Sequence, residues 1–284
     1  MPSANWVAYW RLMRFDKPIG TALLWYPVAW SLWLSSQGLP SLRLFTLFLL
    51  GTITMRAAGC VINDIADRQL DAHVARTKKR PLATGQLTLQ NALVCFSILL
   101  SIALFILIHL PPYCFLIALI AALFTALYPF TKRWFDMPQL ILGLAFTSSV
   151  PMVFEAVEGQ FSLITGLLMA LNICWVVAYD TAYAMVDRDD DLLMQMHSSA
   201  ILFGRSDRYV IGVLQIITHG LWLPIAWLSH FDYRFYIIWF VASLFFIHQQ
   251  RLLYDRRGPN CFAAFLNNHW YGLVMWVALI VAFI

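Results

Sequence analysis

The sequence of 284 residues carries too few charges to cover a water-facing surface. Only 12% of its residues are charged and 61% are hydrophobic, whereas a soluble domain has about 25% charged residues. Lipid is therefore expected to be its main solvent. The net charge of +4 is too small to indicate a nucleic-acid partner, and five cysteines without CxxC spacing indicate neither a disulfide framework nor a cysteine metal site.

Nine apolar stretches are long enough to cross a bilayer as helices, which takes roughly 20 mainly apolar residues. In chain order they are 19–36, 42–63, 91–110, 113–131, 138–154, 161–185, 209–228, 234–250 and 267–284. The sequence therefore predicts an all-α integral membrane protein, a bundle of about nine transmembrane helices that forms one domain over residues 1–284.

Basic residues predict the orientation of this bundle, because cytosolic segments of multi-pass proteins are enriched in Lys and Arg. With a cytosolic N-terminus, the far side receives only Arg43 and Arg234 of the 19 basic residues, and Arg56 lies within a span. The longest connections then follow the second and sixth spans on the cytosolic side, and long loops often carry function. We therefore expect the N-terminus and the active site on the cytosolic side.

Acidic residues gather in two clusters, at the cytosolic ends of the second and sixth expected spans. The clusters are Asn63-Asp-Ile-Ala-Asp-Arg-Gln-Leu-Asp71 and Tyr179-Asp-Thr-Ala-Tyr-Ala-Met-Val-Asp-Arg-Asp-Asp-Asp191. Steps of three, four and seven residues keep side chains on one face of a helix. Two such faces result: Asn63, Asp67 and Asp71 form the first, and Asp180, Asp187 and Asp191 form the second. A single acidic helix end is usually a solvated cap, but two matching clusters favour a functional site.

The two clusters also resemble each other in spacing. Asp64 and Asp71 are seven residues apart, as are Asp180 and Asp187, and four expected spans separate the clusters. A weak internal repeat of four helices plus four, with a ninth helix appended, would account for both observations.

Facing carboxylates at a membrane boundary repel one another unless a cation lies between them. Mg²⁺ prefers oxygen ligands and is commonly held by one or two carboxylates together with substrate phosphates. Basic residues follow the first cluster directly, in the segment Arg76-Thr-Lys-Lys-Arg80. The acidic clusters, a divalent metal and the side chains of Arg76 and Arg80 together predict a diphosphate-binding site.

Arg56 stands out because it is a charged residue inside an expected span. It precedes Asn63 by seven residues, which places it on the same helix face as Asn63 and Asp67. An unpaired arginine at that depth is costly, so we expect Arg56 to face an internal cavity. A structural salt bridge is the alternative.

At these motifs the sequence resembles the UbiA superfamily of intramembrane prenyltransferases, and its 4-hydroxybenzoate branch in particular. The resemblance covers nearly the whole chain. Its matching segments are Arg11–Gly20, Met55–Cys60 with the Asn63–Asp71 motif, Arg76–Gly85, Tyr128–Arg133, Tyr179–Asp191 and Ser199–Gly204.

The resemblance implies a nine-helix bundle around a central cavity, closed on the cytosolic side by caps from the two long loops, in a bacterial inner membrane. It implies a reaction of ubiquinone biosynthesis that joins the polyprenyl group of a polyprenyl diphosphate to 4-hydroxybenzoate, at the ring carbon ortho to the hydroxyl. The residues implied to hold Mg²⁺ and the diphosphate are Asn63, Asp67, Asp71, Asp187 and Asp191, with the four aspartates as the catalytic groups.

For the carboxylate of the aromatic acid, Arg133 matches the arginine proposed in this family, and Arg56 is the alternative. The remaining residues expected to contact substrates are Arg14, Arg76, Arg80, Lys132 and Asp180. The sequence departs from the family at His197, where relatives usually carry Lys. We therefore expect that position 197 is not essential as a cation.

Two alternative functions stay open. One is a prenyltransferase for another aromatic acceptor. The other is an ion-coupled secondary transporter, which would also use carboxylates in the membrane and internal repeats. The acidic clusters lie at helix ends rather than at mid-bilayer and are followed by arginines, which favours the enzyme. The sequence predicts no particular protein partner.

Overall fold

The computed structural model describes residues 6–69 and 77–284 of the chain. These residues form twelve α-helices and one short 3₁₀ helix, and no strand. In chain order the elements are α1 (Trp6–Leu12), α2 (Ile19–Ser35), α3 (Leu42–Ala66), α4 (Leu89–Leu107), α5 (Pro112–Thr131), α6 (Pro138–Thr147), α7 (Ser149–Glu158), α8 (Leu163–Leu193), α9 (Ser199–Phe203), η1 (Gly204–Ser206), α10 (Asp207–Leu228), α11 (Tyr233–Leu252) and α12 (Gly258–Ala282).

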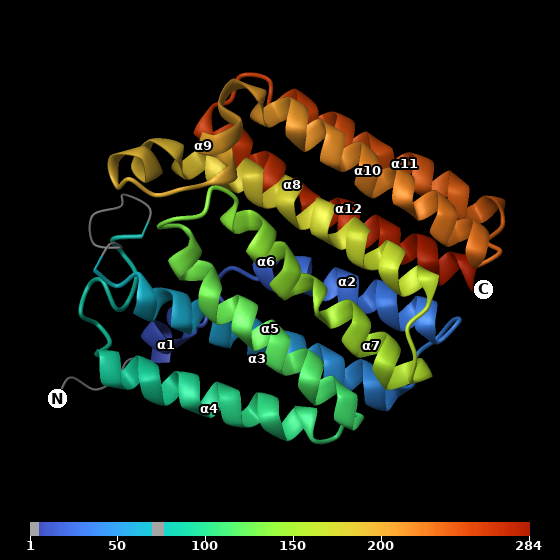
Figure 1. Ribbon diagram of the computed structural model, residues 1–284, viewed down its shortest axis with the longest axis horizontal. Helices are drawn as coiled ribbons and strands as arrows, with labels where there is room; N and C mark the ends of the chain where they lie inside the picture. The colour runs from blue at the N-terminus through green and yellow to red at the C-terminus, as the bar shows by residue number, and fades with distance from the viewer. Residues whose placement is uncertain (1–5, 70–76) are drawn as a thin grey trace.

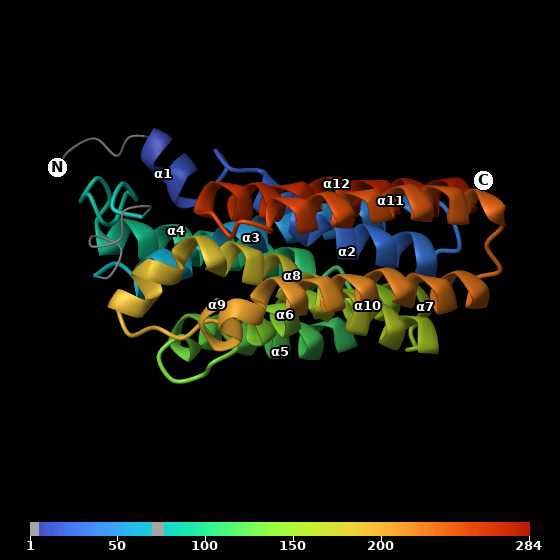
Figure 2. The same cartoon turned by 90° about the horizontal axis from the view of Figure 1, so that it is seen from above.

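The long helices lie side by side along one axis (Figure 1). The C-terminal ends of α3 and α8 are at the same end of the molecule, which we call the motif end because both acidic clusters belong to it. Seen from above, α11 and α12 lie on one side of the bundle and α5 on the other (Figure 2). Helix α8 packs against α2, α6, α7, α9, α10 and α12, so it is the central helix.

Seven segments of the described residues are long and apolar enough to cross a membrane. They are α3, α4, α5, the α6–α7 pair, α8, the segment from α9 to α10, and α12. The all-α, multi-pass architecture expected from the sequence is thus confirmed. Helices α2 and α11 coincide with two further expected spans but are not among these seven, so the count of nine stays a prediction.

Helix α8 runs past the expected boundary at residue 185 and ends at Leu193. At 1.5 Å per residue its 31 residues extend about 46 Å, well beyond the ~30 Å of the hydrocarbon core. Its C-terminal turns therefore project out of the bilayer and carry Asp187 and Asp191 with them. Apolar patterning marks only the part of the helix that lies in lipid, which explains the shorter expectation.

Two other boundaries differ from the expected spans. The fifth span is broken into α6 and α7 at Ser148, because Pro151 has no N–H to donate to the carbonyl of Thr147. The last helix begins at Gly258 rather than at residue 267, with Pro259 in its first turn, where the missing N–H costs nothing.

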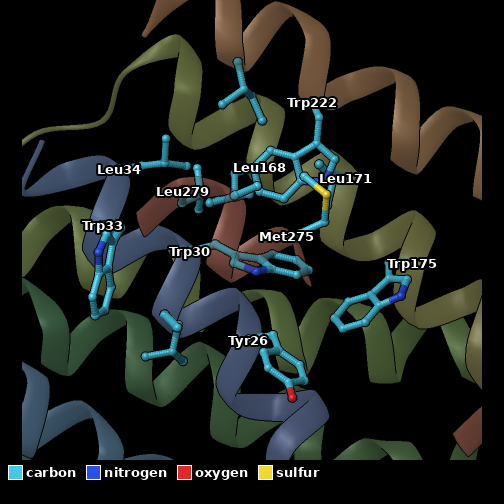
Figure 3. Packing of buried hydrophobic residues seen from close by; sticks show 14 of the residues in the cluster. Tyr26, Trp30, Trp33, Leu34, Leu168, Leu171, Trp175, Trp222, Met275 and Leu279 are labelled. Carbon is cyan, nitrogen blue, oxygen red and sulfur yellow. The ribbon is translucent and has the colours of Figure 1, made fainter. Parts of the chain in front are cut away.

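Tryptophan side chains fill the interior between α2, α8, α10 and α12 (Figure 3). Trp30, Trp175 and Trp222 are all fully buried, and the ring centroid of Trp30 lies 5.0 Å from that of Trp175 and 5.2 Å from that of Trp222. The indole of Trp30 donates to the carbonyl of Gly272 at 3.2 Å. The described residues form surface pockets along α4 and between α2 and α12. Neither pocket is the central cavity that the sequence predicts, so that cavity stays a prediction.

Candidate functional site

The second acidic cluster lies on about the last four turns of α8. Asp180, Asp187 and Asp191 are all partly buried, whereas Asp189 is exposed. Because the helix is continuous from Leu163 to Leu193, the spacing argument applies directly, and the first three carboxylates share one face.

The first acidic cluster lies where α3 ends. Ala66 is the last helical residue and Asp67 follows as the C-cap, so the helix-face argument holds for Asn63 but does not extend to the residues after Asp67. Two of the expected site residues, Asp71 and Arg76, lie outside the described residues. The sequence-based grouping of Asn63, Asp67 and Asp71 is therefore not tested.

Asp64, which the sequence argument left without a role, is a deeply buried carboxylate of the first cluster. It is 1% exposed. Arg14, in the turn after α1, contacts its Oδ1 atom at 2.7 Å, and Arg80 contacts the same atom at 3.1 Å. These two arginines were expected to contact the substrate. In the structure they bind Asp64 and hold the segments before and after α3 to its end.

The two clusters meet at Tyr128, near the end of α5. Asp180, Asp67 and Asp191 all act electrostatically on its hydroxyl. The ammonium group of Lys132 lies 5.5 Å from the centroid of the Tyr128 ring, so this lysine also lies beside the tyrosine. Sequence reasoning missed Tyr128, although it begins the matching segment Tyr128–Arg133.

Arg56 lies deeper, below the first cluster. Seven residues of helix place it about 10 Å from Asn63, and its guanidinium group lies directly against Gly20 on α2. None of the ion pairs seen in residues 6–69 and 77–284 involves Arg56. The structure therefore favours an arginine that faces the interior over one that makes a salt bridge.

Three buried polar atoms on α3 and α8 have no hydrogen-bond partner in the described part of the chain. They are Arg56 Nε, Asn63 Oδ1 and the hydroxyl of Tyr179. Arg56 and Asp180 both lie within electrostatic range of the Tyr179 hydroxyl. Buried polar atoms are nearly always hydrogen-bonded, and these three therefore mark a place that a polar ligand can complete.

Arg133, the arginine favoured from the sequence, lies against Phe130 at the surface. It is exposed, and its guanidinium group lies 5.6 Å from the centroid of the Phe130 ring, which is itself 48% exposed. Lys132 and Arg133 follow directly after the last residue of α5, and only Lys132 is directed toward Tyr128.

His197 binds a neighbouring loop. Its Nδ1 atom lies 2.6 Å from Asp136 Oδ1, and its backbone N–H donates to the carbonyl of Lys132 at 2.7 Å. The segment after α8 is thereby joined to the segment after α5.

The donor set of the two clusters suits a hard cation. It consists of carboxylate oxygens and the Asn63 amide oxygen, which is buried without a partner, and these are ligand types that Mg²⁺ prefers. Among the described residues, no three His, Cys, Asp or Glu side chains are close enough to form a site by themselves. A metal here would need ligands from a substrate as well, which is how Mg²⁺ is often held.

A membrane-spanning bundle with two acidic clusters at one end, both within electrostatic range of Tyr128, is an arrangement that suits an intramembrane transferase for charged substrates. The chain belongs to the UbiA prenyltransferase family, which matches residues 24–280.

Similar proteins extend along nearly the whole chain. A 4-hydroxybenzoate octaprenyltransferase of Legionella pneumophila (strain Lens) is 50% identical over 98% of this chain and 99% of its own length. The enzyme of the same name from Shewanella amazonensis is 46% identical over 97% of this chain and 95% of its own length.

Solved structures share the fold at lower identity. The apo structure of a UbiA homologue from Aeropyrum pernix K1 has a TM-score of 0.80 at 23% identity and covers 92% of this chain and 97% of its own. A UbiA homologue from Archaeoglobus fulgidus, bound to GPP and Mg²⁺, has a TM-score of 0.70 at 18% identity and covers 96% of this chain and 99% of its own.

Proposed function

We propose that the protein transfers a polyprenyl group from polyprenyl diphosphate to 4-hydroxybenzoate, at the ring carbon ortho to the hydroxyl, in ubiquinone biosynthesis. Relatives named for this acceptor are about half identical to the chain along nearly its whole length, which supports the acceptor. The observation that carries the proposal is that carboxylates of both clusters lie within electrostatic range of Tyr128, while the partly buried Arg56, one turn or more deeper, has an Nε atom without a hydrogen-bond partner.

The acidic clusters are proposed to hold the donor. Asn63, Asp67, Asp71, Asp187 and Asp191 would bind Mg²⁺ together with the diphosphate, and the archaeal homologue bound to GPP and Mg²⁺ supports this assignment. When bound, the metal supplies positive charge for the departing diphosphate. Around it, the proposed contacts of the diphosphate are Arg14, Arg76, Arg80 and Lys132, with Asp180 at the inner edge of the site.

The acceptor is proposed to bind below the diphosphate, with its carboxylate on Arg56. A carboxylate that enters an apolar bundle must be paired, and arginine can hold it with two parallel hydrogen bonds. The 10 Å or so of helix between Arg56 and Asn63 leaves room for the aromatic ring. We prefer Arg56 to Arg133 because the Arg133 side chain lies over the exposed Phe130.

The reaction then follows from these contacts. The allylic C–O bond breaks and its electrons go to the diphosphate, while the buried surroundings keep water from the cation that forms. The ring carbon ortho to the hydroxyl supplies the electron pair of the new C–C bond. The proton on that carbon then leaves and restores the aromatic ring; no side chain is assigned as the base.

The arrangement in the membrane completes the proposal. We propose that the chain crosses the membrane nine times, through the seven apolar segments and through α2 and α11. These crossings would form one domain, made of two four-helix repeats and a ninth helix, around a central cavity. The motif end would face the cytosol of a bacterial inner membrane, capped by the long loops after α3 and α8. The distribution of basic residues supports this orientation.

The test is transfer of radiolabel from 4-hydroxybenzoate into lipid extract by membranes that contain the protein. We expect transfer that requires polyprenyl diphosphate and a divalent metal, and none in membranes with Asp187→Asn. Other hydroxylated aromatic acids, tested in parallel, should be used less well. Transfer to one of these but not to 4-hydroxybenzoate would contradict the acceptor, and ion-driven uptake without any transfer would favour the transporter.

A further inference from the structure

Asp207 is a buried carboxylate that lies outside both acidic clusters. It is the first residue of α10 and is 0% exposed. A buried charge is costly unless it is paired and hydrogen-bonded. Asp207 is paired twice: the guanidinium groups of Arg188 and Arg256 both contact its Oδ2 atom, the second at 2.7 Å.

The two arginines join three segments of the chain at this carboxylate. Arg188 comes from α8 and Arg256 from the turn between α11 and α12. Both also donate to the carbonyl of Gly204 in η1, and Arg188 donates to the carbonyl of Ala200 on α9 at 2.9 Å. The end of α8, the α9–η1 turn and the α11–α12 turn are therefore all held to one buried charge.

The backbone geometry of Arg256 indicates that this three-residue cluster of Asp207, Arg188 and Arg256 holds a fixed conformation. Arg256 has a φ of 56°, in the left-handed region that residues with a side chain seldom adopt. Such a conformation persists only where the surroundings fix it. The contacts of Arg256 with Gly204 and Asp207 supply those surroundings.

Arg188 connects the Asp207 contacts to the second acidic cluster, because it belongs to the sequence of that cluster. It directly follows Asp187 and precedes Asp191 by three residues. At 3.6 residues per turn, Asp187 and Asp191 point within about 40° of each other, and Arg188 points to one side of both. Because Arg188 is anchored at its far end, the rotation of the last turns of α8 is fixed. The direction of the two carboxylates is fixed with it.

These last turns need such support. Helix ends fray when tertiary contacts do not hold them, and α8 ends on Leu192 and Leu193, which are 55% and 83% exposed. We propose that Asp207 is a positioning residue that aims Asp187 and Asp191 at the metal and diphosphate through Arg188. This rests on the proposed function and adds to it a residue that touches neither substrate nor metal.

The test compares two variants of the full-length protein in detergent. Asp207→Asn keeps the volume of the side chain but removes its charge. Arg188→Lys keeps the charge, but a lysine lacks the fork that reaches a carboxylate and two carbonyls together. The matched control is Asp232→Asn, which removes an ion pair with Arg234, 2.8 Å long. This pair belongs to the connection from α10 to α11, which lies at the opposite end of the bundle from the motif end (Figure 1).

The main readout is binding of Mn²⁺ in the presence of geranyl diphosphate, followed by electron paramagnetic resonance of the free ion. We expect binding about tenfold weaker in both variants and unchanged in the control, because partners behind metal ligands commonly contribute 10–100-fold. Amide hydrogen exchange of residues 187–193 should be faster in both. The double variant should bind no more weakly than the weaker single variant, because both changes act on one contact.

A purely structural role for Asp207 predicts a different result. The melting temperature of the variants would fall, but Mn²⁺ affinity per folded protein and amide exchange at residues 187–193 would match the wild type. This outcome overturns the proposal.

Prenyl transfer is measured separately. Wild-type protein that binds Mn²⁺ with geranyl diphosphate but transfers nothing to 4-hydroxybenzoate would contradict the function, and the variants would still decide the role of Asp207. Wild-type protein that binds no Mn²⁺ would contradict both.

Discussion

The guanidinium group of Arg56 on α3 lies directly against Gly20 on α2, where even a methyl group would collide with it. Gly20 lies within a helix with ordinary helical geometry, so its small size, and not its backbone freedom, is what the contact requires. The absence of a side chain at position 20 therefore sets where the Arg56 guanidinium can lie.

This contact predicts the effect of Gly20→Ala. Alanine favours a helix more than glycine does, so α2 should form normally, but the added methyl displaces the guanidinium group. We expect the KM for 4-hydroxybenzoate to rise about tenfold, equal to about 1.4 kcal/mol, with the KM for the donor unchanged. Gly166→Ala on α8 is the control, since nothing lies within 4 Å of a methyl group there. Equal effects in both variants would show that Gly20 acts on the fold and not on Arg56.

The two candidate anchors for the acceptor are separated by Arg56→Ala and Arg133→Ala. Removing one partner of a buried charge pair costs about 2 kcal/mol or more, so Arg56→Ala should lower kcat/KM for 4-hydroxybenzoate at least about thirtyfold. Arg133→Ala should change it little, because this side chain lies over Phe130. Steady-state kinetics with each substrate varied in turn provides the measurement. If only Arg133→Ala lowers acceptor use, the sequence-based preference was right and the geometric one is wrong.

The positions of these two arginines show what residue spacing can and cannot predict. Position 56 is inside a long apolar helix, and the period of the helix alone puts it on the face of Asn63. Arg133 follows the end of α5, where no helical period applies, so the direction of its side chain depends on the turn. A resemblance in sequence predicts which residue type stands at position 133, but it does not predict in which direction the side chain points.

Other residues of the site are not singled out by their type or spacing, although Tyr128 and Tyr179 each begin a segment that matches the family. Tyr128 and Tyr179 are two of 11 tyrosines in a chain with 15% aromatic residues, so their types do not single them out. Asp207 pairs with residues 19 and 49 positions away, and only the packing of α8, α10 and α12 brings them together. By contrast, Asp187 and Asp191 were placed on one face correctly because α8 is continuous.

The need for metal is tested by Asp67→Asn and Asp187→Asn. Each change removes a negative charge from a different cluster and leaves the shape of the side chain nearly unchanged. We expect each to reduce prenyl transfer to near background, and excess chelator to abolish transfer by the wild type until Mg²⁺ is restored. Insertion in the membrane, checked by protease protection, controls for misfolding. Full transfer in chelator, or in either inserted variant, would contradict the metal and diphosphate assignment.

The role of His197 is tested by His197→Gln. Its Nδ1 atom contacts Asp136 at 2.6 Å, so the side chain joins the segment after α8 to the segment after α5, and its backbone N–H adds a bond to the carbonyl of Lys132. Glutamine can still reach Asp136 with a neutral donor. We therefore expect the KM for the polyprenyl donor at neutral pH to change by less than about tenfold, which is 1.4 kcal/mol.

Asp136→Asn should give a similarly small change, since it alters the other side of the same contact. If His197→Gln raised the donor KM more than tenfold while Asp136→Asn did not, the histidine would have to act as a cation on the diphosphate, and the contact with Asp136 would not be its function.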